Sequence, residues 1–104
     1  MTTFDKREEE FEKKFALDEE QKFKAEARRN RLLGLWAAEN LGLTGDAATA
    51  YSKEVVAADF EAAGVLRKVM GDFAAKSVVI TEQAIRAKMN ELAAVAAAEV
   101  KAGK

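Results

Sequence analysis

The sequence predicts an all-α protein: a four-helix bundle preceded by a long, charged N-terminal helical arm that we expect to be mobile. Three observations support this prediction. The 104 residues include no Pro and only six Gly, and the strong helix formers Ala, Glu, Lys, Arg and Leu dominate the composition. Apolar residues recur at helical spacing, and no stretch alternates apolar and polar residues as a half-buried strand would. The length corresponds to one domain with a modest core.

Residues 1–31 differ in composition from the rest of the chain and predict a charged helix, whose first part, residues 1–19, we expect to be the arm. They carry nine basic and nine acidic side chains, so more than half of the segment is charged. Acid–base pairs four residues apart each stabilise a helix by about 0.2–0.5 kcal/mol, which leaves an isolated helix marginal in water. We therefore expect the segment to form a helix without being firmly folded alone. The pairs are Glu9–Lys13, Glu10–Lys14, Asp18–Lys22 and Glu20–Lys24.

The next stretch, LLGLW (residues 32–36), is the densest apolar cluster of the chain and predicts insertion of its large side chains into the core. Gly34 inside it costs a helix about 1 kcal/mol relative to Ala, so we expect it to allow a close helix crossing rather than a hinge. Gly42 predicts the C-terminal cap of this helix, and Thr44 predicts the N-cap of the next one.

Three further apolar stripes predict the remaining helices. We expect the second helix to end at Gly64, and a connection over residues 76–80 to lead to an N-cap at Thr81. Short turns containing Gly and Thr between four helices favour a small bundle. The stripes are Tyr51, Val55, Ala58 and Ala62, widened by Val56 and Phe60; Leu66, Val69, Met70 and Phe73; and Ile85, Met89, Leu92, Ala96 and Val100.

Several function classes are disfavoured by what the chain lacks. Without Cys or His there is no disulfide, no thiol chemistry and neither of the two usual transition-metal ligands, so we predict no metal site and no cofactor. The only serines, Ser52 and Ser77, have no His to activate them, so we expect no catalytic residues. No apolar run approaches the roughly 20 residues that span a bilayer, and the acidic N-terminus has no signal core. We expect a soluble, cytoplasmic protein.

Two short motifs could suggest binding of nucleic acid or phosphate, but each has a simpler structural explanation. ARRNR (residues 27–31) lies beside an acidic block in a chain of net charge −1, which indicates a solvated helix face and no nucleic-acid binding. GLTGD (residues 42–46) precedes a helix, where phosphates can bind, but it lacks the GKT or GKS of a Walker loop. Asp46 would repel a phosphate, which favours a capping role. A weak contact with an adenine nucleotide stays open.

Three phenylalanines interrupt the charged arm in helical register. Phe4, Phe11 and Phe15 fall within about 20° of one line on a helix. One interpretation is that they form the core face of the first helix. However, a core-facing helix has about three to four apolar residues per two turns, whereas residues 5–10 and 18–22 are wholly polar. A narrow aromatic seam on a charged helix favours docking into a partner's groove, with folding on binding.

The most specific stretches are MTTFD and FEKKFALDEE near the start and ARRNRLLGLWAA further on. Together they resemble the zeta subunit of alphaproteobacterial F-type ATP synthases. The likeness continues through LRKV (residues 66–69) and IRAKMNEL (residues 85–92) and so covers nearly the whole chain. It implies a four-helix fold and an inhibitory N-terminal segment. This segment is expected to enter a catalytic α/β interface of F1, approach the central γ stalk and block rotation in the hydrolysing direction.

The resemblance implies a partner-binding arm at residues 1–19 and a bundle domain at residues 20–104. Phe4, Phe11 and Phe15 would form the seam that meets F1. The implied protein is a non-catalytic regulator, peripheral to the inner membrane through F1 and without direct membrane insertion. The charged contacts that we infer beside the seam are Lys6, Arg7, Lys13 and Lys14.

Two alternatives stay open from the sequence. One is a helical module whose first helix is fully packed and which senses a small ligand such as an adenine nucleotide. The other is an assembly or stability factor that binds F1 without slowing ATP hydrolysis.

Overall fold

A computed structural model of the protein describes residues 17–61 and 63–104. Every regular element in this part of the chain is helical, which confirms the predicted all-α class and the bundle of four helices. The elements are α2 (Glu19–Asn40), α3 (Gly45–Ala57), the short 3-10 helix η1 (Ala58–Phe60), α4 (Gly64–Ala75) and α5 (Glu82–Lys101).

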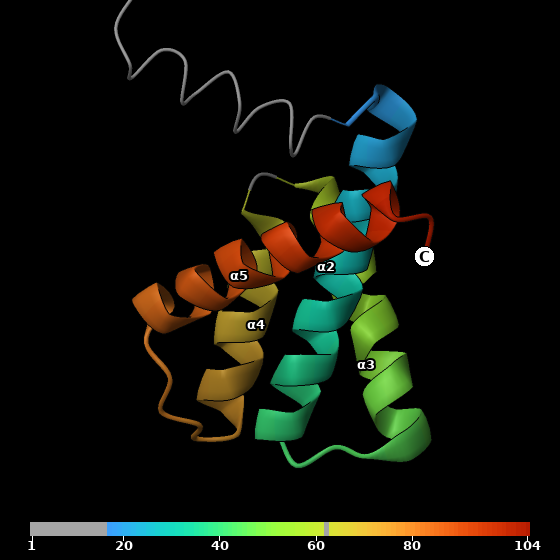
Figure 1. Ribbon diagram of the computed structural model, residues 1–104. Coiled ribbons are helices and arrows are strands. Elements are labelled where there is room, and N and C mark those ends of the chain that lie inside the picture. Colours follow the sequence, from blue (N-terminus) through green and yellow to red (C-terminus); the bar gives the residue numbers. More distant parts are fainter. Residues whose placement is uncertain (1–16, 62) are drawn as a thin grey trace, which may run out of the picture.

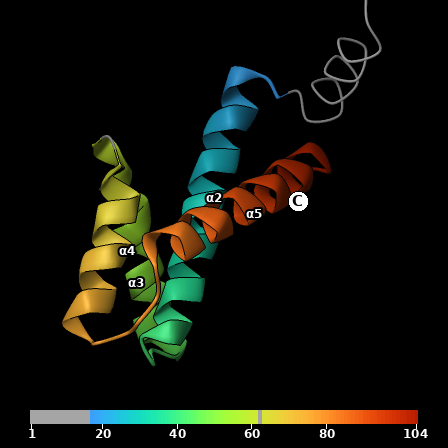
Figure 2. The same cartoon turned by 90° about the vertical axis from the view of Figure 1, so that its left-hand side faces the viewer.

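Helix α2 is the centre of the fold (Figure 1). It makes its most extensive contacts with α3, which runs beside it, and with α5, which crosses it. In the view turned by 90°, α3 and α4 lie on one side of α2, and α5 crosses α2 from the side of α4 to the other side (Figure 2). The C-terminal end of α5 therefore lies beside the N-terminal half of α2, far from the turn that joins α2 to α3.

The main core is one apolar cluster to which all four helices contribute. Trp36 packs edge-on against Phe73 at its margin, with ring centroids 5.8 Å apart. A second, smaller cluster joins the N-terminal part of α2 to the end of α5. The largest fully buried apolar side chains of the main core are Phe73, Leu33, Ile85, Val55 and Val69, and the smaller cluster contains Ala25, Ala96 and Val100 with Leu17 packed against it.

Gly34 lies where α2 crosses α3. A Cβ atom at this position would lie 2.6 Å from the Cα atom of Ser52, closer than non-bonded carbon atoms can approach. The crossing buries Ser52, whose hydroxyl donates a hydrogen bond to the carbonyl oxygen of Thr49 at 2.7 Å. The close crossing expected from the sequence is therefore confirmed.

Local capping signals place most helix ends as predicted. Gly42 follows α2 with φ +78°, and the amide of Leu43 donates to the carbonyl of Ala38 at 2.8 Å, which closes a Schellman turn. Thr44 is the N-cap of α3, although its side chain makes no capping hydrogen bond. Thr81 is the N-cap of α5, and its hydroxyl accepts from the amide of Ala84 at 3.1 Å.

The predicted end of the second helix at Gly64 is wrong. Helix α3 ends at Ala57 and tightens into η1, and Gly64 is instead the first residue of α4. The glycine is needed there because a Cβ atom would lie 2.1 Å from the carbonyl oxygen of Ala58. Close backbone approach, rather than a helix stop, explains this glycine.

Three apolar residues predicted to face the core are exposed. Phe60, at 82% exposure, lies in η1, where the residues rotate by about 120° each and the stripe of α3 no longer continues. Leu35 is exposed because successive helical residues rotate by about 100°, so Leu33 faces the core while Leu35 cannot. Met70 lies at the edge of the α4 stripe and is likewise on the surface.

Within residues 17–61 and 63–104, no helix combines the length and the apolar character needed to cross a membrane.

The methyl group added by Gly34→Ala should cost about 1–3 kcal/mol because it would push α3 away from α2, so the net destabilisation should be up to about 2 kcal/mol. The gain in helix propensity, about 1 kcal/mol, offsets only part of this cost. Gly71→Ala is the matched control, since an added Cβ in the exposed α4 position meets nothing within 4 Å. The control should raise stability by up to about 1 kcal/mol. Urea unfolding followed by circular dichroism measures both, and a Gly34→Ala variant as stable as the control would contradict the close crossing.

Candidate functional site

The residues predicted to bind a partner all precede the described part of the chain. Phe4, Phe11, Phe15 and the four charged residues inferred beside them lie outside the described residues, so the structure places none of them. The described residues do show where the predicted arm joins the bundle and which surfaces lie around that junction.

Helix α2 begins at a complete capping box. The carboxylate of Asp18 accepts a hydrogen bond from the amide of Gln21 at 2.8 Å, and the Gln21 side chain accepts from the amide of Asp18 at 3.2 Å. The predicted pair of Glu20 with Lys24 is present at 3.3 Å. Asp18 was predicted to pair with Lys22, but its carboxylate caps the helix instead. Local chemistry thus fixes the start of α2 next to the predicted end of the arm.

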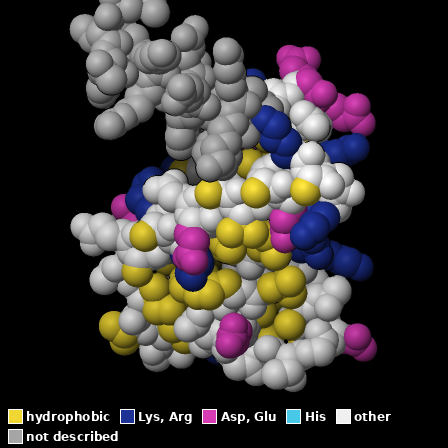
Figure 3. Space-filling view, in the orientation of Figure 1, with side chains coloured by type: hydrophobic (Ala, Val, Ile, Leu, Met, Phe, Trp, Pro, Cys, Tyr) yellow, Lys and Arg dark blue, Asp and Glu magenta, His cyan; other side chains and the backbone are white. Residues whose placement is uncertain are grey.

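The lining of a groove beside this junction includes four basic residues, three from α2 and one that follows α5. It encloses about 530 Å³ between α2, the end of α3 and the end of α5. Ala27, Val56 and Val100 give it apolar walls. Figure 3 shows basic side chains gathered at the upper right, near the start of α2 and the end of α5. We call this feature the basic groove, and its basic residues are Lys24, Arg28, Arg31 and Lys104.

Arg28 ties the two sides of the basic groove together. Its guanidinium donates to the carbonyl oxygen of Lys104 and forms an ion pair with Glu99 at 3.5 Å. The end of α5 is itself fixed by a turn in which the amide of Lys104 donates to the Glu99 carbonyl at 2.9 Å. Gly103 makes this turn possible because its φ of +79° is favourable only for glycine.

The basic run in α2 is less solvated than its sequence predicted. Arg31 is exposed, but Arg28 and Arg29 are half-buried, and the guanidinium of Arg29 donates from Nε and Nη2 to the side-chain oxygen of Asn30 at 3.0 and 2.8 Å. Asn30 itself is buried. The prediction of a simple solvated helix face is therefore wrong for two of the three arginines, because α5 covers one flank of α2.

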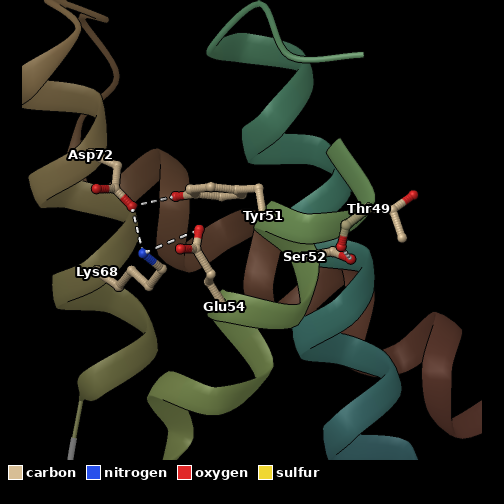
Figure 4. Close-up of polar contacts among 6 residues, drawn as sticks. All are labelled: Thr49, Tyr51, Ser52, Glu54, Lys68 and Asp72. Atoms are coloured by element: carbon tan, nitrogen blue, oxygen red, sulfur yellow. Dashed lines mark hydrogen bonds and ion pairs between the residues drawn. The ribbon is translucent and has the colours of Figure 1, made fainter. Parts of the chain in front are cut away.

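A second polar cluster links α3 to α4 (Figure 4). The Tyr51 hydroxyl donates to Asp72 at 2.8 Å, and the Lys68 ammonium donates to the same carboxylate oxygen at 3.1 Å. Lys68 also lies 5.2 Å from the centre of the Tyr51 ring and 4.0 Å from the Glu54 carboxylate. Tyr51 was predicted to lie on the apolar stripe of its helix, but its polar partners were not predicted. Two signals were available: a buried tyrosine hydroxyl needs an acceptor, and Lys68 and Asp72 are four residues apart.

This cluster is suited to holding helices together rather than to chemistry. Burial raises the pKa of Tyr51, and the hydrogen bond to Asp72 and the charges of Asp72 and Glu54 raise it further, so the hydroxyl stays protonated and donates. The nearby Ser52 is buried with its hydroxyl directed to a backbone carbonyl. In the described segments, no group of three or more acidic side chains is arranged to hold a metal ion.

The carboxyl group of Asp59 in η1 influences the titration of the Glu26 carboxyl group in α2. A side-chain hydrogen bond with Asp59 raises the pKa of Glu26 above its ordinary value of 4.5; burial and the charge of Asp59 act in the same direction, and Arg29 opposes them. The folded state therefore binds a proton at Glu26 more readily than the unfolded state. The resulting stabilisation is complete below the unfolded pKa and is lost as the pH rises through the folded pKa.

Replacing Glu26 with Gln should therefore remove part of the decline in stability as the pH rises above the ordinary carboxyl pKa of 4.5. Thermal unfolding measured as a function of pH tests the expectation. Asp59→Asn should give a similar effect because it removes the other carboxyl group, and the double variant should add little to either single change. Identical pH dependence in wild type and Glu26→Gln would contradict the coupling of the two groups.

Comparison with known proteins agrees with the helical architecture and extends to the N-terminal residues. A comparison with curated proteins finds no match. A structure solved by solution NMR is 53% identical to this chain with a TM-score of 0.69, and the similarity covers 79% of this chain and 96% of that one. The sequence profile of a family described as ATPase inhibitor subunit zeta matches residues 1–99. This match includes the predicted arm and almost all of the described helices, and the chain therefore belongs to the ATPase inhibitor subunit zeta family.

Proposed function

We propose that the protein is a non-catalytic inhibitor of ATP hydrolysis by F1-ATPase. The observation that carries this proposal is the family match, which spans residues 1–99 and so includes the arm as well as the bundle. In the cell it would act in the cytoplasm, peripheral to the inner membrane through its contact with F1. Its partners would be the α and β subunits and the central γ stalk.

The arm is the proposed inhibitory element. The capping box at Asp18 starts α2, so the three seam phenylalanines all precede the first helix of the described bundle. We propose that residues 1–19 insert at a catalytic α/β interface near γ, as a helix whose seam faces the interface. A helix held there would block an interface that must open and close during each turnover, and so would stop rotation in the hydrolysing direction.

The aromatic seam should contribute more binding free energy than the basic residues beside it. Burying a phenylalanine contributes about 1.5–3 kcal/mol, whereas an exposed ion pair contributes about 0–1 kcal/mol. Phe4, Phe11 and Phe15 are therefore proposed as the anchors. The residues proposed as supporting charged contacts are Lys6, Arg7, Lys13 and Lys14.

Phe11→Ala should raise the concentration needed for half-maximal inhibition by about 10- to 100-fold, as expected for the loss of one buried aromatic anchor. Removal of residues 1–19 should abolish inhibition. ATP hydrolysis by F1 that lacks its own inhibitor is the measurement. Phe60→Ala is the control, because this phenylalanine is exposed on the bundle and its loss should leave inhibition unchanged.

Equal inhibition by the full chain and by the chain without residues 1–19 would contradict a function in the arm. Binding to F1 without slower hydrolysis would instead indicate an assembly factor. The proposed block is also unidirectional, because rotation in the synthesis direction would help to expel the arm. A strong fall in the rate of ATP synthesis would contradict that part of the proposal.

The basic groove favours one further candidate function, the sensing of an adenine nucleotide. Its apolar walls suit a base, and its basic side chains suit phosphate groups. Its volume of about 530 Å³ falls within the range of about 300–1,000 Å³ that is usual for small-ligand sites. Such binding would be compatible with inhibition, since groove and arm are separate parts of the chain.

If the basic groove binds ATP, Arg31→Gln should weaken binding about tenfold, the effect expected when one charge-assisted contact is lost. Isothermal titration calorimetry of the full chain with ATP measures this. Arg67→Gln, which removes an exposed arginine of α4 outside the groove, is the matched control. Equal affinities of the two variants would place any nucleotide site elsewhere, without bearing on inhibition by the arm.

A further inference from the structure

A small pocket lies where the chain enters the bundle, on the flank of α2 that faces α5. It encloses about 170 Å³, and its apolar lining consists of Leu17, Ala25, Ala93 and Ala97. Alanine side chains on both helices leave this space open, because neither fills the region between the two backbones. We call it the Leu17 pocket.

The size of the Leu17 pocket suits one side chain rather than a separate ligand. Sites that enclose small-molecule ligands measure about 300–1,000 Å³, and this pocket is well below that range. Leu17 packs against the small cluster formed by Ala25, Ala96 and Val100, so the chain already follows this surface as it reaches α2.

The remaining lining favours an aromatic side chain over an aliphatic one. Lys22, Glu26 and Arg29 complete the lining, so two cations and one carboxylate adjoin an apolar surface. Cations attract the face of an aromatic ring. Arg29 is held in position by its two hydrogen bonds to Asn30, at 3.0 and 2.8 Å, and is therefore preorganised for such a contact.

We propose that the ring of Phe15 occupies the Leu17 pocket when the protein is free of F1. Phe15 precedes Leu17 by two residues, so their Cα atoms lie at most about 7 Å apart in any conformation. Phe11 and Phe4 lie further away along the chain. Phe15 is thus the one seam residue that connectivity alone brings to the pocket.

This inference rests on the proposed function, in which the same Phe15 anchors the arm to F1. One ring cannot occupy both places. Docking in the Leu17 pocket would hold part of the population in a form that cannot bind F1. The apparent affinity for F1 would then equal the intrinsic affinity multiplied by the fraction of molecules that is ready to bind. The bundle would then restrain its own inhibitory arm.

The first test uses the full chain alone, so it does not depend on inhibition. Nuclear Overhauser effects between the Phe15 ring and the methyl groups of Ala93 and Ala97 are expected. Phe15→Leu should shift both methyl signals, because the ring current is lost, whereas the control Phe4→Leu should leave them unchanged. Absence of these Overhauser effects, or equal methyl shifts in the two variants, would overturn the docking of Phe15.

The second test asks whether docking restrains the arm. Ala97→Leu fills the pocket and should lower the concentration for half-maximal inhibition of F1 by up to about tenfold. Ala98→Leu, the same change at the adjacent exposed position of α5, should have no effect. Ala93→Leu provides a second filling variant if Ala97→Leu does not fold. Folded filling variants with unchanged inhibition would overturn the restraint, whereas a wild-type chain that shows the Overhauser effects but never inhibits would refute the proposed function instead.

Discussion

The contact between Gly34 and Ser52 sets the distance between α2 and α3, and the rest of the bundle is arranged around that distance. Because the two backbones approach closely there, Leu33 and Val55 are both fully buried in the common core. The same crossing orients α3 so that the Tyr51 hydroxyl meets Asp72 of α4. A larger residue at position 34 would separate the helices and loosen both the apolar core and this hydrogen bond.

Much of the fold could be predicted because its signals are local. Gly42 after α2 and Thr81 before α5 act through atoms within a few residues of themselves. The nearby sequence is therefore sufficient to predict where these helices end and begin. The roles of Gly64 and Phe60 were predicted wrongly because their environments depend on the turn of η1. No Gly or Pro in the sequence marks that turn. The close approach of the Ala58 carbonyl to position 64 is a property of the folded chain, and periodicity cannot reveal it.

The candidate site likewise has one part that could be predicted from the sequence and one part that could not. The aromatic seam of the arm is a local pattern, visible as three phenylalanines in register within a charged segment. The basic groove could not be predicted, because Arg28 meets Glu99 only after α5 has folded back across α2, 71 positions later in the chain. The net charge of −1 even argued against a protein that binds polyanions. Net charge is a sum over the chain, whereas the groove depends on which charges the topology brings together.

The two ends of α2 differ in how firmly they are held. α2 has 22 residues and α3 has 13, so at about 1.5 Å per residue α2 extends well beyond its neighbour. Its C-terminal half packs large side chains into the main core, but its N-terminal half meets α5 largely through alanines, and Phe23 there is 73% exposed. Less buried apolar area means less stabilisation. The N-terminal half of α2 is therefore held by less apolar burial than the C-terminal half, and the hydrogen bond and ion pair of Arg28 supply part of its contact with α5.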